Sequence, residues 1–559
     1  MKKIRIAGPP GTGKTTFLVN IFYDCIQKYS AKDILVMSHT NAAADHIRDQ
    51  ILNPTNIEKY QKKNKVEIFY KVMDAKRELD DNVSTIHKYC KDELKTPPDN
   101  VFEINDYTNL IALDPLFNKF TKTINFKYVQ GLFKRHPFFK FYNFARDNIG
   151  SSEKHLSQYY QSLDYESRLD FKYPLHELIR LTNLYNDYKN DPNQHHRVGK
   201  VLDFTDMVED YCEIVESPMI KVLIVDEAQD SSIIQRKAEA KISKNCDYFY
   251  KAGDPDQSIF EFSGADPDAF HKEFAQPEIE LEQGYRCPRV VNEYCRQIIQ
   301  PIWQDYNYSR IWKPREELDQ DGNPTGVVVE GELYHLLNLR NSPNLDKLIK
   351  RLKVSNESFI FTHRGGKAEN FIDFLFKQGL PMKFLGDTRY PFKYPKTEIK
   401  NHREFNRFVN GDKISLAAVK KMLKQIDKEY LGPSYTEDNM DLLERGYQSM
   451  EFFIKNRYLQ PVVAKVKNFQ DITKPASFQM KNYIKTIVDN DRDLSEPRIA
   501  IGNIHTIKGL EFDNVVLDQR ITRQEDQNTK RRLKFVACSR AKQSLFLIKS
   551  SNMMKGYSL

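Results

Sequence analysis

Short apolar runs and longer amphipathic segments alternate along much of the 559-residue chain, which predicts strands followed by helices. The segment KIRIAG (3–8) alternates like a short buried strand and leads into a helix that begins near Lys14. The β-branched run KVLIVD (221–226) predicts a buried parallel strand, and CDYFYKAG (246–253) predicts the next one. The expected fold class is α/β, with parallel sheets flanked by helices.

Two long stretches, 91–199 and 388–495, read instead as mainly helical. In the first, PLHELIRLTNLYNDYKN (174–190) has helical patterning, and residues 124–146 interleave basic with aromatic side chains. That interleaving suits a nucleic-acid surface, but an aromatic core with a basic solvated face is the favoured interpretation. Proline, aromatic and basic residues at 387–408 predict a hinge into the second stretch.

Composition narrows the class of protein. Hydrophobic residues make up 40% and charged residues 29%, as in soluble globular chains, and roughly 150 residues per domain suggests about four domains. The net charge of +8 favours a polyanionic partner, and 35 Phe with 30 Tyr offer rings for base stacking. No window reaches the roughly 20 apolar residues that span a bilayer, so no membrane partner is expected. Seven scattered cysteines without a CxxC pair predict a reduced cytoplasmic protein without structural zinc.

The segment GPPGTGKTT (8–16) fits the phosphate-binding loop G-x-x-x-x-G-K-[ST]. Its glycines let backbone N–H groups converge on phosphates, Lys14 reaches the β- and γ-phosphates, and the Thr15 hydroxyl suits Mg²⁺. The loop therefore predicts a bound nucleoside triphosphate with Mg²⁺. The predicted nucleotide-binding residues of the loop are Gly8, Pro9, Pro10, Gly11, Thr12, Gly13, Lys14, Thr15 and Thr16. Kinases, GTPases, transporters and motors all share such a loop.

Two adjacent acids end the apolar run at 221–226 and are predicted to face the same site, because ligands bind at the carboxyl ends of parallel strands. Asp226 is predicted to hold the Mg²⁺ shell and Glu227 to polarise the attacking water. Gln257, just beyond the next strand, is a candidate sensor of the γ-phosphate. Phe260 and Phe262 follow it at a spacing that puts both rings on one side of an extended segment, where bases stack.

Further motifs follow in order and carry a resemblance to the superfamily 1 helicases of the UvrD/Rep/PcrA class. They are VMSHTNAAADHI (36–47), STIHKYC (84–90), VLDFTDMVED (201–210), DEAQDSS (226–232), GDPDQSIFEFSGA (253–265), LEQGYRCPRVVNEY (281–294), FIFTHRGGKAENFIDFL (359–375), IGNIHTIKGLEFDNVVL (501–517) and RRLKFVACSRAKQSLFL (531–547).

The resemblance implies two RecA-like P-loop motor domains, each with a mainly helical inserted accessory domain. The first motor domain, 1A, is expected at 1–90 and 200–284, with its insert, 1B, at 91–199. The second motor domain, 2A, is expected at 285–387 and 496–559, with its insert, 2B, at 388–495.

The resemblance also assigns roles to single residues. Arg286 and Arg540 resemble arginine fingers that reach the γ-phosphate from the second motor domain. Tyr285 resembles the aromatic residue that stacks on adenine, and Glu511 the acid on the ribose or γ-phosphate side. The DNA-binding residues implied by the family pattern are His39, Thr40, His87, Phe260, Phe262 and His505. Without the family, Arg540 reads as a solvated helix residue.

Three positions depart from the family pattern. His39 stands where an aromatic Phe or Tyr is usual, and Ser263 replaces a DNA-contacting arginine. Asn503 stands where a threonine is common. The predicted ATP chemistry is untouched by these changes, whereas the predicted contacts with the DNA strand are altered.

The predicted function is that of an ATP-dependent DNA helicase or single-strand translocase, and the resemblance implies 3′-to-5′ movement. Its expected partners are single-stranded DNA, tailed duplex DNA and protein loading partners. An ATP-gated nucleic-acid-binding switch without unwinding activity is the alternative. A P-loop kinase is disfavoured because a kinase has no use for Glu227 as a base acting on water.

The loop lies early, with seven residues before it. The family usually carries an upstream segment whose glutamine reads the adenine edge, and seven residues are too few to supply it. The nucleotide base is then expected to be held by stacking on Tyr285 and by backbone groups. Stacking does not distinguish one base from another. Relaxed nucleotide choice, with GTP or CTP supporting hydrolysis, is the expectation.

Overall fold

The computed structural model divides into two compact units, which are described here one at a time. The first contains residues 1–286, 296–327 and 531–535, and the second contains 287–295, 328–530 and 536–559. The residues that the structure describes are 1–118, 133, 136–148, 152–162, 168, 173–261, 264–274, 276–306, 309–320, 322–339, 342–354, 358–361, 369–385, 395–441, 443, 446–466, 468–474, 478–489, 497–519 and 526–549.

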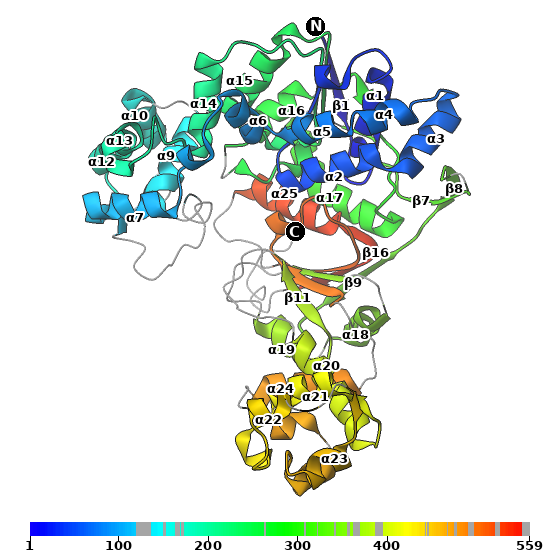
Figure 1. Cartoon of the computed structure of the whole chain (residues 1–559). Helices are drawn as coiled ribbons and strands as arrows, with labels where there is room; N and C mark the ends of the chain where they lie inside the picture. Colours follow the sequence, from blue (N-terminus) through cyan, green and yellow to red (C-terminus); the bar gives the residue numbers. More distant parts are fainter. Residues whose placement is uncertain are drawn as a thin grey trace. The chain divides into compact units, whose positions relative to one another are not determined.

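A six-stranded sheet in the order β3-β2-β4-β5-β1-β6 forms the centre of the first unit. Its strand β1 is labelled in Figure 1, near helices α1 and α5. All of the sheet's pairings are parallel, and β1 and β4 lie on either side of β5. Its strands are β1 (Lys2–Ala7), β2 (Ile34–Ser38), β3 (Val83–Thr85), β4 (Val222–Val225), β5 (Tyr248–Gly253) and β6 (Ile279–Glu280). The parallel α/β class predicted from the strand pattern is confirmed for this sheet.

The helices of the first unit connect and cover these strands, and a small hairpin of β7 (Glu316–Leu318) and β8 (Pro324–Val328) follows them. The helices are α1 (Lys14–Cys25), α2 (Asn41–Leu52), α3 (Pro54–Asn64), α4 (Phe69–Asp74), α5 (Lys76–Asn82), α6 (Ile86–Glu93), α7 (Ile104–Leu113), α9 (Pro137–Asn148), α10 (Glu153–Ser162), α12 (Leu175–Asn190), α13 (Pro192–His195), α14 (Phe204–Ile214), α15 (Ile233–Ile242), α16 (Pro267–Glu273) and, continuing from the second unit, α17 (Arg289–Asp305).

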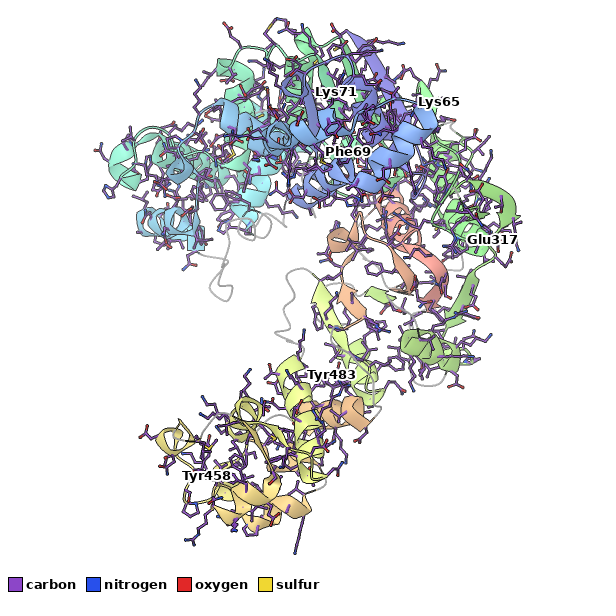
Figure 2. The ribbon with its side chains drawn as sticks, turned by 45° about the vertical axis from the view of Figure 1, so that its right-hand side comes forward. Lys65, Phe69, Lys71, Glu317, Tyr458 and Tyr483 are labelled. Atoms are coloured by element: carbon purple, nitrogen blue, oxygen red, sulfur yellow. The ribbon has the colours of Figure 1, made fainter. Side chains whose placement is uncertain are left out.

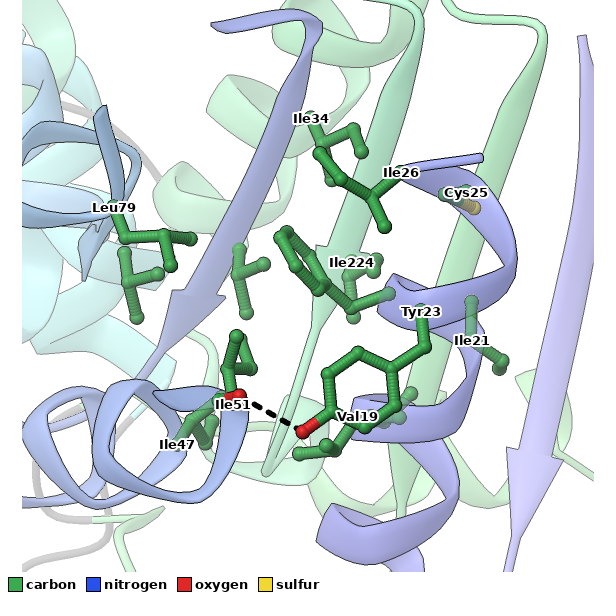
Figure 3. Close-up of a cluster of buried hydrophobic side chains, with 14 of the residues drawn as sticks. Val19, Ile21, Tyr23, Cys25, Ile26, Ile34, Ile47, Ile51, Leu79 and Ile224 are labelled. Atoms are coloured by element: carbon green, nitrogen blue, oxygen red, sulfur yellow. Dashed lines mark hydrogen bonds between the residues drawn. The ribbon is translucent and has the colours of Figure 1, made fainter. Parts of the chain in front are cut away.

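An apolar core holds α1 and α2 against the sheet, and it therefore fixes the helix that starts at the phosphate-binding loop. Leu18, Phe22 and Ile224 are at most 1% exposed within it. Tyr23 is buried in the same core, and its hydroxyl donates a hydrogen bond to the Ile51 carbonyl at 2.8 Å (Figure 3). That bond gives the phenol a partner inside the core, as a buried hydroxyl requires.

Aromatic side chains build a separate core within the 91–199 stretch. Phe138, Phe139 and Tyr142 on α9 are at most 1% exposed and pack against Tyr185 of α12. For the described part of 124–146, the favoured interpretation of an aromatic core is therefore confirmed. Residues 119–132 lie outside the described part of the chain.

Buried ion pairs attach this aromatic core to α14. The guanidinium of Arg146 contacts Asp203 at 3.0 Å and Asp206 at 2.7 Å, and Lys189 contacts the same two carboxylates at 3.0 and 2.7 Å. All four side chains are at most 4% exposed. Removing one partner would leave a buried charge uncompensated, which typically costs about 3–5 kcal/mol.

Asp147, beside this cluster, is expected to make the first unit less stable as the pH rises. Burial raises the pKa of Asp147 to about 7, against a smaller opposing effect from Arg146. The folded state therefore binds this proton more tightly than the unfolded state, and the resulting stability is lost as the pH rises through 7. Linkage gives a loss of about 1.4 kcal/mol between pH 6 and pH 8.

Thermal melts of wild type and Asp147→Asn at both pH values measure this effect, because the amide has no proton to lose. The melting temperature of Asp147→Asn should fall less between pH 6 and pH 8 than that of wild type. Asp99→Asn, an exposed acid in the same stretch, is the control. Equal pH slopes in Asp147→Asn and wild type would contradict the assignment.

A second six-stranded parallel sheet, in the order β11-β14-β10-β15-β16-β9, forms the centre of the second unit. Its strands are β9 (Glu332–Leu336), β10 (Ser358–Phe361), β11 (Met382–Leu385), β14 (Ile499–Gly502), β15 (Phe512–Asp518) and β16 (Ala541–Ile548). The described helices assigned mainly to this unit are α18 (Leu345–Val354), α19 (Glu369–Lys377), α20 (Lys396–Val409), α21 (Leu416–Leu423), α22 (Glu437–Asp441), α23 (Met450–Lys455), α24 (Phe478–Asp489) and α25 (Gln527–Cys538).

The described part of 388–495 is mainly helical and has its own core, which includes Phe405, Val419 and Phe453. A short antiparallel pair of β12 (Ile414–Ser415) and β13 (Tyr447–Gln448) accompanies the helices. Tyr483, labelled on α24 in Figure 2, donates to the Leu380 carbonyl at 2.9 Å and accepts from the Met382 amide at 3.2 Å. These two hydrogen bonds connect α24 to the start of β11 and the residues just before it.

The compact units differ from the predicted motor-domain ranges at two places, around residue 285 and at 531–535, which also pack with the first unit. The ranges place residue 285 onward in the second motor domain, whereas Tyr285, Arg286 and residues 296–327 pack with the first unit. The physical reason at residue 285 is that the backbone at 282–285 pairs with Lys313 and Gly11 of the first unit. The described helices include none long and apolar enough to cross a membrane.

Candidate active site

The phosphate-binding loop lies between the end of β1 at Ala7 and the start of α1 at Lys14. Gly13 has φ 80°, in the left-handed region where a side chain is strained. A Cβ added to Gly8 would lie 2.5 Å from the Thr12 hydroxyl, so this position also needs glycine. The loop thus leads directly into a helix N-terminus, which attracts phosphate.

Lys14 is held inside the loop, with 8% of the residue exposed. Its Nζ donates to the carbonyl oxygens of Gly8 at 2.8 Å and Pro9 at 3.3 Å. Burial lowers the pKa of Lys14, and the carboxylates of Asp254, Glu227 and Asp226 oppose that shift. Carbonyl oxygens therefore solvate the ammonium within the loop.

Thr15 and Asp226 are brought together although they come from α1 and the end of β4. The Thr15 hydroxyl donates to Asp226 Oδ2 at 2.9 Å. Burial, followed by repulsion from Glu227, raises the pKa of Asp226 to about 6, while Thr15 and Lys14 oppose the shift. A hydroxyl and a carboxylate are the hard oxygen ligands that Mg²⁺ takes, so these residues fit that ion.

Glu227 follows Asp226 in a left-handed conformation, with φ 53°. Such a φ is uncommon for a residue with a side chain and persists where its surroundings enforce it. The Glu227 amide donates to Asp226 Oδ1 at 2.9 Å, and its carboxylate accepts a hydrogen bond from Gln229 Nε2. The backbone and Gln229 together fix the direction of this carboxylate.

Gln257 lies in a 3₁₀ turn (Pro255–Gln257) after β5 and is 3% exposed. Its Nε2 donates to Asp254 Oδ2 at 2.6 Å. The Asp254 amide in turn donates to Gln229 Oε1 at 3.0 Å. A chain of hydrogen bonds, which passes through the backbone amide of Asp254 and the side chain of Gln229, therefore joins Gln257 to Glu227.

Tyr285 and Arg286 lie against the phosphate-binding loop. The Tyr285 amide donates to the Gly11 carbonyl at 2.7 Å, and the Tyr285 side chain is 45% exposed. A Cβ added to Gly11 would lie 2.5 Å from Arg286 Cβ. Gly11 therefore allows the close approach of the chain at 285–286.

The candidate residues of the second unit are Glu511, Arg540 and His505. Arg540 is 2% exposed, and its Nε donates to the Val536 carbonyl at 2.9 Å. The interpretation of Arg540 as a solvated helix residue is therefore wrong, because the side chain folds back over the end of α25. Glu511 is exposed, with Lys542 Nζ 3.8 Å from its carboxylate.

His505 is half-buried on a 3₁₀ turn after β14. The side chain of Asn503 caps this turn and accepts a hydrogen bond from the Thr506 amide at 3.0 Å. The departure at Asn503 therefore has a structural consequence, since asparagine is among the best N-capping residues.

Two of the candidate DNA-binding residues form a ring pair. His39 and Phe260 have ring centroids 5.3 Å apart at an interplanar angle of 38°. Thr40 caps α2 by accepting a hydrogen bond from the Ala43 amide at 3.2 Å. Phe262 lies outside the described residues.

His87 contacts residues of α14 and α15. Its Nδ1 is 3.4 Å from Gln235 Nε2, and its ring meets Phe204 edge-on at 5.9 Å. Burial lowers the pKa of His87 to about 4, with a smaller opposing effect from Asp203. The imidazole is therefore neutral at physiological pH and offers a hydrogen bond or a ring face.

Three residues beside Glu227 and Gln257 were missed by sequence reasoning, namely Gln229, Asp254 and Arg310. Gln229 and Asp254 lie within motifs that drew attention, but nothing in their spacing shows that they touch each other. Arg310 lies in SRIWKPR (309–315), which carries no pattern of its own. Only the folded chain brings its guanidinium to Asp254 and Asp256.

Sequence comparisons with known proteins find helicases. The sequence profile of the UvrD/REP helicase N-terminal domain matches residues 1–277, and that of the UvrD-like helicase C-terminal domain matches residues 498–548. A probable DNA helicase II homolog of Mycoplasma pneumoniae is 21% identical, over 96% of this chain and 80% of that protein. The ATP-dependent DNA helicase Rep of Buchnera aphidicola is 22% identical, over 92% of this chain and 79% of that protein.

The Gabija protein GajB of Bacillus cereus is also similar, with 21% identity over 68% of this chain and 74% of that protein. Both helicase domain profiles match in the order that the motifs predict, one in each half of the chain. The chain therefore belongs to the UvrD/Rep-like helicase family.

Proposed function

We propose that this chain is an ATP-dependent DNA helicase or single-strand translocase that moves 3′ to 5′. The observation that carries the proposal is the convergence of Lys14, Thr15, Asp226, Glu227 and Gln257 at the ends of three neighbouring strands. Family membership supports DNA as the nucleic acid. The two parallel sheets support a pair of RecA-like motor domains, with the inserts at 91–199 and 388–495.

Each residue at this site has a proposed task. Lys14 turns its ammonium from the Gly8 and Pro9 carbonyls to the phosphates, and Thr15 with Asp226 holds Mg²⁺. Glu227 takes a proton from the attacking water at its carboxylate, and Gln257 senses the γ-phosphate. Bound MgATP supplies the phosphoryl group and the charge neutralisation that the metal provides.

The remaining roles rest on the family pattern and the local geometry. Tyr285 presents a half-exposed ring for stacking on the base, and Arg286 lies over Gly11, where it is proposed to act as an arginine finger. Arg540 is proposed as the second arginine finger and Glu511 as the acid at the nucleotide. His39, Thr40, His87, Phe260, Phe262 and His505 are proposed to contact single-stranded DNA.

Phe260→Ala is expected to weaken single-stranded DNA binding by about 1–3 kcal/mol, because each lost base–ring stack costs about that much. Fluorescence anisotropy with a labelled oligothymidylate measures the affinity. Tyr70→Ala is the control, since Tyr70 is a 73% exposed aromatic on α4. An unchanged affinity in Phe260→Ala would assign this ring to structural packing with His39.

Strand displacement from tailed duplexes tests the function and the direction together. The expected result is ATP-dependent displacement of a duplex with a 3′ tail and none with a 5′ tail. Displacement that needs a 5′ tail would overturn the direction. DNA-stimulated hydrolysis without displacement of either duplex would favour the translocase or the ATP-gated switch.

A further inference from the structure

Arg310 forms a buried bridge to the loop that carries Gln257. Its Nη1 lies 2.8 Å from Asp254 Oδ1, and its Nη2 contacts Asp256 Oδ2. The Arg310 side chain is 3% exposed, and both aspartates are fully buried. A guanidinium suits this position because its permanent, delocalised charge can neutralise two carboxylates at once.

Arg310 supplies the largest favourable charge at Asp256, and Arg532 supplies a smaller one. Two buried aspartates two residues apart repel each other, and each carries a high desolvation cost without a cation. Trp303 Nε1 donates to Asp256 Oδ2 at 2.8 Å, but this neutral donor supplies no full charge. Without Arg310 we expect one aspartate to take up a proton or to turn away.

Asp254 connects Arg310 to the candidate catalytic residues Gln257 and Glu227 through hydrogen bonds. Its carboxylate accepts the hydrogen bond from Gln257 Nε2 at 2.6 Å and caps the 3₁₀ turn by accepting from the Asp256 amide at 3.0 Å. Its backbone amide orients Gln229, which contacts the Glu227 carboxylate. A displaced Asp254 would therefore loosen both Gln257 and Glu227.

The chain that follows Arg310 makes a second connection. The Lys313 amide donates to the Glu282 carbonyl at 2.9 Å, and the Gly284 amide donates to the Lys313 carbonyl at 3.1 Å. A Cβ on Gly284 would lie 2.5 Å from that carbonyl oxygen. The next residue, Tyr285, is bonded to Gly11 of the phosphate-binding loop. Residues 310–313 thus join the Gln257 loop to the chain that carries Tyr285 and Arg286.

We propose that Arg310 is a positioning residue for hydrolysis, which holds Asp254 and Asp256 so that Gln257 and Glu227 keep their orientation beside the phosphate-binding loop. This inference rests on the proposed ATPase function. The ion pairs of Arg310 are with Asp254 and Asp256, on the turn that carries Gln257, and its charge has a weaker electrostatic effect on Lys14. Its loss should therefore impair turnover more than nucleotide binding.

The test compares Arg310→Met and Arg310→Lys with wild type in the full chain. Steady-state assays with saturating single-stranded DNA give kcat, and equilibrium titration with a fluorescent ATP analogue gives Kd. Arg310→Met should lower kcat about 10- to 100-fold with Kd within threefold. Arg310→Lys, which keeps the charge without the fork, should recover part of the loss.

Arg180→Met is the matched control. Arg180 also bridges two carboxylates, those of Asp114 and Glu177, but it is 47% exposed and lies in the 91–199 insert. The kcat and the Kd of Arg180→Met should equal those of the wild-type protein. A fall in kcat as large as that of Arg310→Met would overturn the inference, because it would show a general effect of losing an ion pair.

The outcomes separate the inference from the function on which it rests. If wild type does not hydrolyse ATP with any nucleic acid, the proposed function fails. If wild type is active and Arg310→Met keeps its kcat, only the positioning role fails. If Arg310→Met unfolds, Arg310→Lys decides, and a folded Arg310→Lys protein with wild-type kcat would overturn the role.

Discussion

Lys14→Ala is expected to abolish ATP hydrolysis and unwinding, with kcat/KM lowered by at least about a thousandfold. The ammonium is the only cationic side chain within the described phosphate-binding loop, and carbonyl oxygens of Gly8 and Pro9 hold it in place. A thousandfold loss corresponds to about 4 kcal/mol of transition-state stabilisation, which is reasonable for a charge acting in a site shielded from water.

Phosphate release assays with single-stranded DNA measure this effect, and the melting temperature shows whether the variant is folded. Lys28→Ala serves as the control, because Lys28 lies just beyond the other end of α1, away from the loop. A folded Lys14→Ala protein with more than a tenth of wild-type kcat/KM would show that the loop does not bind the reacting phosphates.

Glu227→Gln is expected to keep nucleotide binding and to lose turnover by about 10²–10⁴-fold, the range that a general base contributes. The amide has nearly the same shape as the carboxylate but cannot take a proton from water. Its Nε2 also replaces the oxygen that accepts a hydrogen bond from Gln229, so some reorientation accompanies the change.

The measurement pairs single-turnover hydrolysis with equilibrium binding of an ATP analogue. Glu58→Gln is a control of the same chemistry, since Glu58 is an exposed acid on α3. Near-normal turnover in Glu227→Gln would mean that another group activates the water.

Local patterns predicted the elements that carry the candidate site, because their causes are local. The apolar run at 222–225 has to be a buried strand, and Asp226 therefore lies at its end. The glycines at 8–13 similarly require a loop that closes on a helix N-terminus. Such features depend on residues that are close together in the sequence.

Contacts between residues that are far apart in the sequence could not be predicted from local patterns. The contact of Arg310 with Asp254 joins a segment after α17 to the turn after β5. The burial of Arg540 depends on how α25 ends against its own sheet, and an isolated helical pattern does not contain that information. The placement of Tyr285 and Arg286 with the first unit comes from backbone pairing with Lys313 and Gly11.

If this chain is a motor driven along DNA, nucleic acid must control ATP hydrolysis at this site. The most direct measurement is the ATPase rate of the purified full chain with Mg²⁺, with and without saturating single-stranded DNA. We predict that DNA raises kcat at least tenfold and that Lys14→Ala removes the stimulated rate. A rate that neither DNA nor RNA changes would contradict the account.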